Sequence, residues 1–121
     1  MSSSRADTDR LVAAKQDVKG RIFVMEILKL TNGCFASISE DQAPRMGTIT
    51  VSVKKERRSV QSSQLIPDSR GAMLANMVGE ILAEQLGGIV VISLYLREEI
   101  EAETMKTLIS EVRRLVRKDP V

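Results

Sequence analysis

The sequence predicts an α/β chain of the α+β type: a mostly antiparallel sheet with two helices on one face. Two observations carry this prediction. An apolar run over residues 21–30 is followed by Asn32-Gly33 and a second apolar run, as in a β-hairpin. Residues 101–118 repeat apolar side chains at helical spacing. The 121 residues are the length of a single domain.

The N-terminal third of the chain is expected to be a polar tail followed by strands. Residues 1–8 are small and polar and predict a disordered tail, and residues 9–121 form one domain. Residues 9–19 fit either a strand or a short helix. Residues 21–30 and 34–39 predict two paired strands, and Asn32-Gly33 predicts a type I′ turn because both residues tolerate a positive φ.

The middle of the chain predicts one more strand and a loop. Residues 46–53 alternate between apolar and hydroxyl side chains, which predicts a strand with one face in water. Its apolar side is Ile49, Val51 and Val53. Residues 54–66 have no clear period and predict a mobile loop.

A helix is expected over residues 67–86. Pro67, Asp68 and Ser69 resemble a capped helix start, and Gly87-Gly88 a helix end. The expected apolar stripe is Leu74, Met77, Val78, Ile81, Leu82 and Gln85. Small residues recur beside it (Gly71, Ala72, Ala75, Gly79, Ala83), and they favour tight packing inside the domain over an external interface.

The last two elements are a strand and a helix. Residues 89–96 contain almost no polar side chain and predict a buried strand. Residues 101–118 predict the second helix, with glutamates in its first turns and arginines in its last, which suits the helix dipole.

The strands are apolar on both faces, although two helices can cover only one. In residues 21–30 one side reads Ile22, Val24, Glu26 and Leu28, and the other side is apolar as well. A strand that is apolar on both sides is buried on both sides. The second face then needs another chain, and these four residues are the predicted dimer interface. The alternatives are that the N-terminal segment covers this face, or that the strands are simply central.

Several function classes lack the residues that they need. The chain has no histidine, the commonest general base and metal ligand. Its single cysteine, Cys34, cannot form an internal disulfide or a zinc site and is expected to be an inert core residue. The glutamates at 98, 99, 101 and 103 are expected to be solvated partners of a helix start, not a metal site. We therefore expect no enzyme and no cofactor.

Charge and hydropathy exclude further partners. The net charge of +2, with three aromatic residues, gives no indication of a nucleic-acid-binding face. No apolar run is long enough to span a membrane, and no secretory signal is seen, so a soluble cytoplasmic protein is expected. The one local concentration of charge is Lys54, Lys55, Arg57 and Arg58. It fits either a solvated loop that protects a sheet edge or a loop that docks on an acidic client.

The order of elements resembles the proteasome assembly chaperone 3 and 4 family, the chaperone 4 branch more closely. The resembling parts are FVMEILKLTNGCFASI (residues 23–38), the long loop after Val53 and MLANMVGEILAEQLGGIVVISLYL (residues 73–96). The resemblance implies a sheet with two helices on one face, a dimer through the other face, and binding of a proteasome α-type subunit during α-ring assembly.

Family members in eukaryotes pair as heterodimers, whereas one chain here favours a homodimer, such as an archaeal relative would form. A heterodimer with a paralogous chaperone is the alternative partner. The alternative function is a roadblock-like or longin-like scaffold that regulates a small GTPase, which a helix at residues 9–19 would favour.

Overall fold

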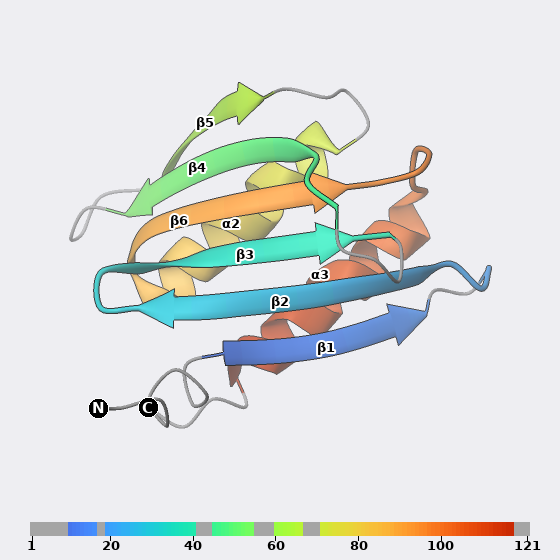
Figure 1. Cartoon of the computed structure of the whole chain (residues 1–121), viewed down its shortest axis with the longest axis horizontal. Coiled ribbons are helices and arrows are strands. Elements are labelled where there is room, and N and C mark those ends of the chain that lie inside the picture. Colours follow the sequence, from blue (N-terminus) through green and yellow to red (C-terminus); the bar gives the residue numbers. More distant parts are fainter. Residues whose placement is uncertain (1–9, 17–18, 41–44, 55–59, 67–70, 118–121) are drawn as a thin grey trace.

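The computed structural model describes residues 10–16, 19–40, 45–54, 60–66 and 71–117. Within them the chain forms six strands and two helices in the order βββββαβα (Figure 1). The strands are β1 (Arg10–Gln16), β2 (Ile22–Leu30), β3 (Gly33–Ser39), β4 (Thr48–Lys54), β5 (Gln61–Ile66) and β6 (Gly88–Tyr95). The predicted α+β class is confirmed.

All six strands belong to one sheet, in the order β1-β2-β3-β6-β4-β5. The two central strands, β3 and β6, are parallel, and every other neighbouring pair in the described sheet is antiparallel. The structure decides between the two alternatives for one segment and contradicts the prediction for another. Residues 10–16, which fitted a strand or a helix, are a strand. Residues 61–66, predicted as part of a loop, form edge strand β5; the loop prediction was wrong there because β5 is held by its pairing with β4 and not by an apolar period.

The predicted hairpin of β2 and β3 is present, but its turn is shifted by one residue. Leu30 pairs with Gly33, so the two loop residues are Thr31 and Asn32. Gly33 is the first residue of β3 and has no positive φ. Glycine is required there because a Cβ would lie 1.9 Å from the backbone oxygen of Ile89 in β6.

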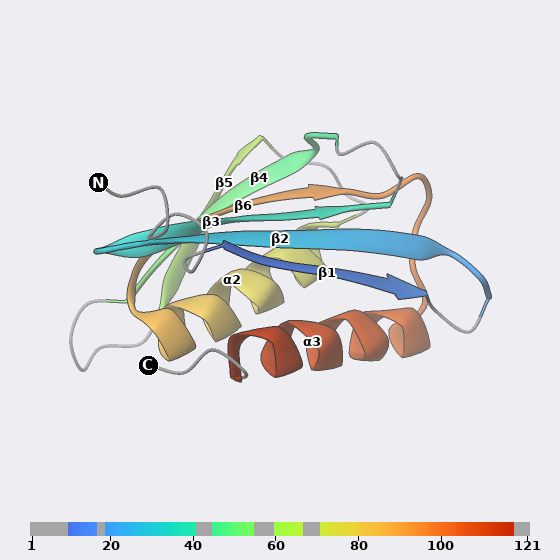
Figure 2. The same ribbon diagram turned by 60° about the horizontal axis from the view of Figure 1, so that its bottom comes forward.

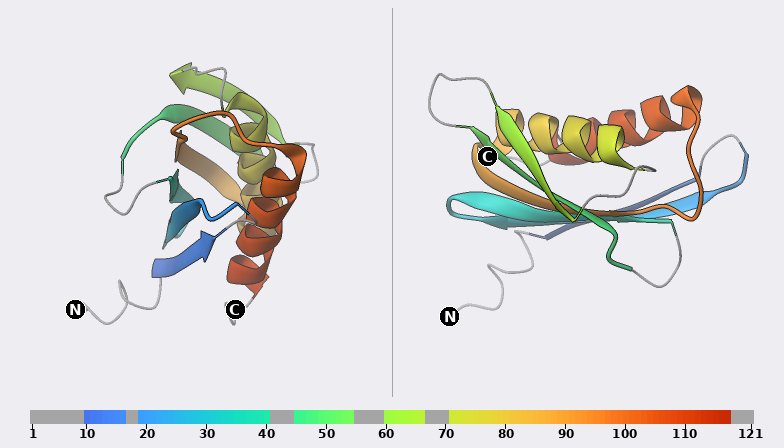
Figure 3. Two further views of the ribbon diagram at one scale, coloured as in Figure 1. Left: turned by 90° about the vertical axis from the view of Figure 1, so that its right-hand side faces the viewer. Right: turned by 90° about the horizontal axis from the view of Figure 1, so that it is seen from above.

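Both helices lie on one face of the sheet, as Figure 2 shows from the side and Figure 3 from the end and the edge. Helix α2 (Ala72–Leu86) packs on β4 and β6, and α3 (Ala102–Arg117) packs beside it towards β1. Gly87 ends α2 with a φ of 77°, as predicted. The helix begins after Gly71 with no side-chain cap; the predicted cap residues, Pro67 to Ser69, lie outside the described residues.

The buried side of α2 differs from the predicted stripe. Leu74, Val78 and Leu82 are buried as predicted, while Met77 and Gln85 are exposed and Ile81 is half-buried. Their places facing the sheet are taken by the small residues Ala75, Gly79 and Ala83. The small-residue spacing therefore serves close packing within the domain, as expected.

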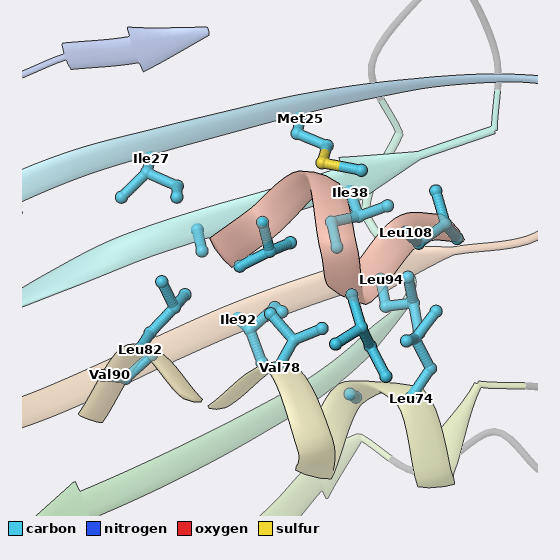
Figure 4. Close-up of a cluster of buried hydrophobic side chains, with 14 of the residues drawn as sticks. Met25, Ile27, Ile38, Leu74, Val78, Leu82, Val90, Ile92, Leu94 and Leu108 are labelled. Atoms are coloured by element: carbon cyan, nitrogen blue, oxygen red, sulfur yellow. The ribbon is translucent and has the colours of Figure 1, made fainter. Parts of the chain in front are cut away.

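The core lies between the sheet and the two helices (Figure 4). Its side chains are aliphatic apart from Phe23, Met25 and Cys34. They come from alternate positions of β2, β3 and β6 and from the facing sides of both helices. Met25, Ile38, Ile92 and Leu94 are almost fully buried against Leu74 and Val78 of α2 and Leu108 of α3. None of the helices in the described part of the chain is long and apolar enough to cross a membrane.

Candidate protein-binding face

The face of the sheet opposite the helices is open over most of its area, and only at the end next to residues 45–47 are Ser39 and Ile49 of this face buried. Figure 1 looks directly onto this open face, with both helices behind it. Six large apolar side chains on it are between 39 and 53 % exposed: Val12, Ile22, Leu28, Leu30, Phe35 and Ile89. A contiguous apolar patch that spans several strands is typical of a surface that binds another protein.

Strand β4 turns its apolar side towards this open face. The hydroxyl residues Thr48, Thr50 and Ser52 are buried under α2, and Thr50 is 0 % exposed. Ile49, Val51 and Val53 point to the open face, and Ile49 is only 8 % exposed there. The prediction that the hydroxyl side of β4 faces water was wrong: this side faces α2, and at Ser52 the close approach of Gly79 requires a small side chain.

The close approach of α2 explains why small side chains lie between it and β4. A Cβ added to Gly79 would lie 2.3 Å from Ser52 Oγ, so a larger pair cannot fit without displacement. Ser52 Oγ is hydrogen-bonded to Ser62 Oγ at 2.7 Å. Among the described residues, Thr50 Oγ1 and Asn76 Oδ1 are buried without a hydrogen-bond partner. The interior beneath β4 is thus more polar than its outer surface.

Cross-strand pairing arranges the open face in rows that run across the strands. At the end where β2 turns into β3, two adjacent rows are apolar from β2 to β4 and end in the polar side chains of Arg10 on β1 and of Ser63 and Gln61 on β5. We call the apolar side chains of these rows the hairpin-end patch: Leu28, Leu30, Phe35, Val51, Val53, Ile89 and Val91. The next row is polar in its middle, where Glu26 pairs with Ser37 and Ser37 with Ser93.

The opposite end of the face carries a cation. The Arg45 guanidinium lies over the Tyr95 ring at 5.7 Å from its centroid, and the Arg45 amide donates to Ser39 Oγ at 3.1 Å. The open face is therefore apolar at one end and mixed at the other.

The predicted interface residues Ile22, Val24, Glu26 and Leu28 all lie on the open face, on the single strand β2. Glu26 is paired with Arg10 of β1 at 2.9 Å. Whether the four residues form an interface stays a prediction. The face is wider than β2, and the most exposed members in its centre and far half were missed, above all Phe35. Phe35 could have been predicted from the register of the hairpin, which places it beside Leu28 on the same face.

The predicted docking residues fall largely outside the described chain. Lys54 ends β4 and forms an ion pair with Glu84 of α2. Lys55, Arg57 and Arg58 belong to residues 55–59, which the structure does not describe.

A second cluster surrounds Arg21 and Glu40 at the end of the sheet, beside a cavity of about 760 Å³. The Arg21 guanidinium donates to both Glu40 oxygens at 2.6 Å and also to the backbone oxygens of Glu98 and Glu99. The Arg97 amide donates to Glu40 Oε1 at 2.9 Å. Burial opposes the charge of Glu40, but the bonds from Arg21 and Arg97 outweigh it and lower the pKa of this carboxyl. The cluster ties β2, β3 and the β6–α3 connection together.

The single thiol and the acidic side chains are candidates for reactive or metal-binding groups. Cys34 is buried in the core, and burial raises the pKa of its thiol to about 11, so it is protonated at neutral pH. Among the described residues, no group of His, Cys, Asp and Glu side chains is placed to hold a metal ion.

Comparison with known proteins finds similarity to a solved structure. No family model matches the sequence, and no curated protein matches it. A solved structure described as a novel chaperone complex for yeast 20S proteasome assembly is similar, with a TM-score of 0.54 over 91 % of both chains at 10 % identity. At this identity the likeness shows a shared fold. It gives no support to an archaeal origin.

Proposed function

We propose that this protein is a non-catalytic assembly chaperone that pairs with a second copy through its open face. As a dimer it binds a proteasome α-type subunit while the α-ring assembles. The observation that carries the proposal is the orientation of β4, whose valines point outward while its hydroxyl residues are buried under α2. The fold shared with a proteasome assembly chaperone complex supports the choice of client.

The size of the open face is of the order that a stable dimer needs. Six strands spaced about 4.8 Å apart and seven residues long cover roughly 24 by 23 Å, or about 550 Å² of flat area. Projecting side chains enlarge the accessible area towards the roughly 800 Å² per partner of a standard interface. Covering Phe35, Leu30 and Ile89 removes apolar surface from water, which favours pairing.

The dimer is tested by measuring mass in solution. Gel filtration with light scattering should give twice the 13.4 kDa of one chain. Phe35→Asp places a charge in the centre of the face and should give a monomer. Met73→Asp is the matched control, because Met73 is 66 % exposed on the outer side of α2, and this variant should remain dimeric. A monomeric wild type contradicts the homodimer, and the remaining alternative is then a heterodimer with a paralogous chaperone.

The client is tested by mixing the dimer with purified proteasome α subunits. Co-migration in gel filtration is expected at micromolar concentration. An assembly chaperone has to dissociate when the next subunit interface forms, so its affinity for the α subunit should be moderate. Absence of co-migration with every α subunit of the source organism contradicts the proposal.

The basic loop is proposed to speed the encounter with the client. Replacing Lys55, Arg57 and Arg58 by glutamate should slow association at low salt and change the dissociation rate little. Equal association rates for the variant and the wild type would show that the loop has no part in docking.

The scaffold alternative is disfavoured by β1. A helix before the first hairpin would have favoured a roadblock-like or longin-like protein, and residues 10–16 form a strand paired with β2. Binding of a small GTPase and not of α subunits would restore this alternative.

A further inference from the structure

The pattern of side chains on the open face restricts how two copies can pair. In a two-fold dimer built by stacking two sheets, the symmetry axis lies in the plane between them, and the same surface is used by both copies. Sheets that stack with their strands roughly aligned can have this axis either across the strands or along them. The two arrangements bring different residues together.

An axis across the strands would place the hairpin-end patch of one copy on the opposite end of its partner. Each strand would then lie on the same strand of its partner, so Val91 of β6 would cover Tyr95, over whose ring the Arg45 guanidinium lies. This arrangement removes a charged group from water beneath apolar side chains, which is costly. An axis along the strands instead places the patch on the patch of its partner, and it places the Arg45–Tyr95 end on the same mixed end of the partner, away from the apolar rows.

The middle of the sheet gives the position of an axis along the strands. Three strands lie on either side of the line between β3 and β6. Rotation about this line places β3 on the partner's β6 and β2 on the partner's β4. Leu28 would then face the position of Val51, and Leu30 that of Val53, because these residues share rows of the sheet.

The side-chain sizes on the two sides of this line are complementary. In each of the two apolar rows a larger residue lies opposite a smaller one: Leu28 with Val51, Phe35 with Val91, Leu30 with Val53 and Ile89 with Gly33. Large side chains facing small ones interdigitate, whereas large facing large leaves strain and small facing small leaves voids. A second copy therefore fits the patch better than an unrelated flat surface does.

We propose that two copies pair with the symmetry axis parallel to the strands, between β3 and β6, so that Leu28 of each contacts Val51 of the other. This rests on the dimer of the proposed function and adds its register. In the polar row Ser37 then faces Ser93 of the second copy, and Glu26, whose carboxylate is paired with Arg10, faces Ile49.

Cross-linking of cysteine variants tests the register. Leu28→Cys and Val51→Cys variants, one carrying a mass tag, are mixed and treated with a short bis-maleimide. Tagged–untagged dimers should be cross-linked. Leu28→Cys alone should not cross-link to itself, since the two positions lie three strand spacings apart, about 14 Å. The unaltered chain is the control for labelling of Cys34, which is buried and protonated.

A mixture of Leu28→Cys and Val24→Cys reports the competing arrangement. Cross-linking of this mixture, or of Leu28→Cys with itself, together with no cross-linking to position 51, overturns the proposed register while the dimer stands. A chain that is monomeric by light scattering overturns the dimer itself, so the two failures are distinguishable.

An exchange of side chains tests the same contact without cysteines. Leu28→Val leaves a void, and Val51→Leu overfills the contact, so each should weaken the dimer roughly tenfold. The double variant restores one large and one small residue at each contact and should recover most of this loss. Losses that simply add in the double variant would overturn the contact.

Discussion

Strand β4 leads to a pair of opposite substitutions with opposite expected results. Thr50→Val changes the inner side of the strand, and Val51→Thr changes the neighbouring outer side. Each exchanges a hydroxyl and a methyl group with little change of shape. If the outer side of β4 stayed in water, Val51→Thr would have almost no effect; if it is buried in a dimer, the new hydroxyl should weaken pairing.

The buried hydroxyl of Thr50 should cost stability in the wild type. It is 0 % exposed, and its oxygen has no hydrogen-bond partner among the described residues. Removing an unsatisfied buried polar group while keeping the shape recovers part of a penalty of about 1–3 kcal/mol. Thr50→Val should thus raise the free energy of unfolding by about 1 kcal/mol, which corresponds to roughly 3–5 °C in the melting temperature.

Val51 should matter for pairing and little for the monomer. Its side chain is half-buried on the open face. Val51→Thr should change the unfolding free energy of a monomer by less than about 1 kcal/mol. In the dimer it buries an unpartnered hydroxyl at two symmetric contacts, and the dissociation constant should rise roughly 30-fold.

Urea unfolding at one fixed protein concentration, with light scattering over a dilution series, measures both effects. Ser52→Ala is the control on the inner side, because Ser52 is hydrogen-bonded to Ser62; its loss should lower stability by about 1 kcal/mol. A clear loss of stability in Thr50→Val would refute the reasoning, since it would mean that the hydroxyl has a partner. An unchanged dimer in Val51→Thr would refute burial of the outer side.

Three further predictions concern single positions. Glu40→Ala should lower the unfolding free energy by about 3 kcal/mol at pH 7, against less than about 1 kcal/mol for Glu101→Ala in an exposed ion pair. Because folding lowers the pKa of Glu40, its contribution to stability is complete above about pH 4.3 and is lost as the pH falls below that value. Urea unfolding at pH 7 and at pH 3 measures both effects. A thiol reagent at pH 7 should modify Cys34 only as fast as the chain opens, so rapid modification of the native protein would contradict its burial. Gly33→Ala should severely impair folding by clashing with the Ile89 backbone, whereas Gly87→Ala, with nothing within 4 Å of its added Cβ, should cost only about 1–2 kcal/mol through its positive φ, as thermal unfolding should show.

The sequence could predict the elements whose own pattern is strong. The hairpin strands, β6 and both helices follow from apolar runs, turn residues and helical spacing, and these local signals survive folding. β5 could not be found in this way, because QSSQLI has no apolar alternation and becomes a strand by pairing with β4. Its neighbour decides its structure.

The orientation of β4 could not be predicted from its alternation. A period of two tells that one side differs from the other, but not which side meets the helices. At Ser52 the close approach of α2 at Gly79 leaves room for a small side chain only, a contact that the alternation of β4 does not reveal. The same limit applied to the candidate interface: β2 was recognised from its own sequence, whereas the patch around Phe35 depends on which strands are neighbours.

The central position of β6 has a consequence for how the chain reaches this structure. β6 lies between β3 and β4 in the sheet, yet it comes after both in the sequence. The N-terminal meander of β1 to β3 and the hairpin of β4 and β5 therefore cannot join until residues 88–95 have been synthesised. Such long-range pairing is slow to form. The full apolar face exists only once nearly the whole chain has emerged, so an incomplete chain on the ribosome cannot present it to a partner.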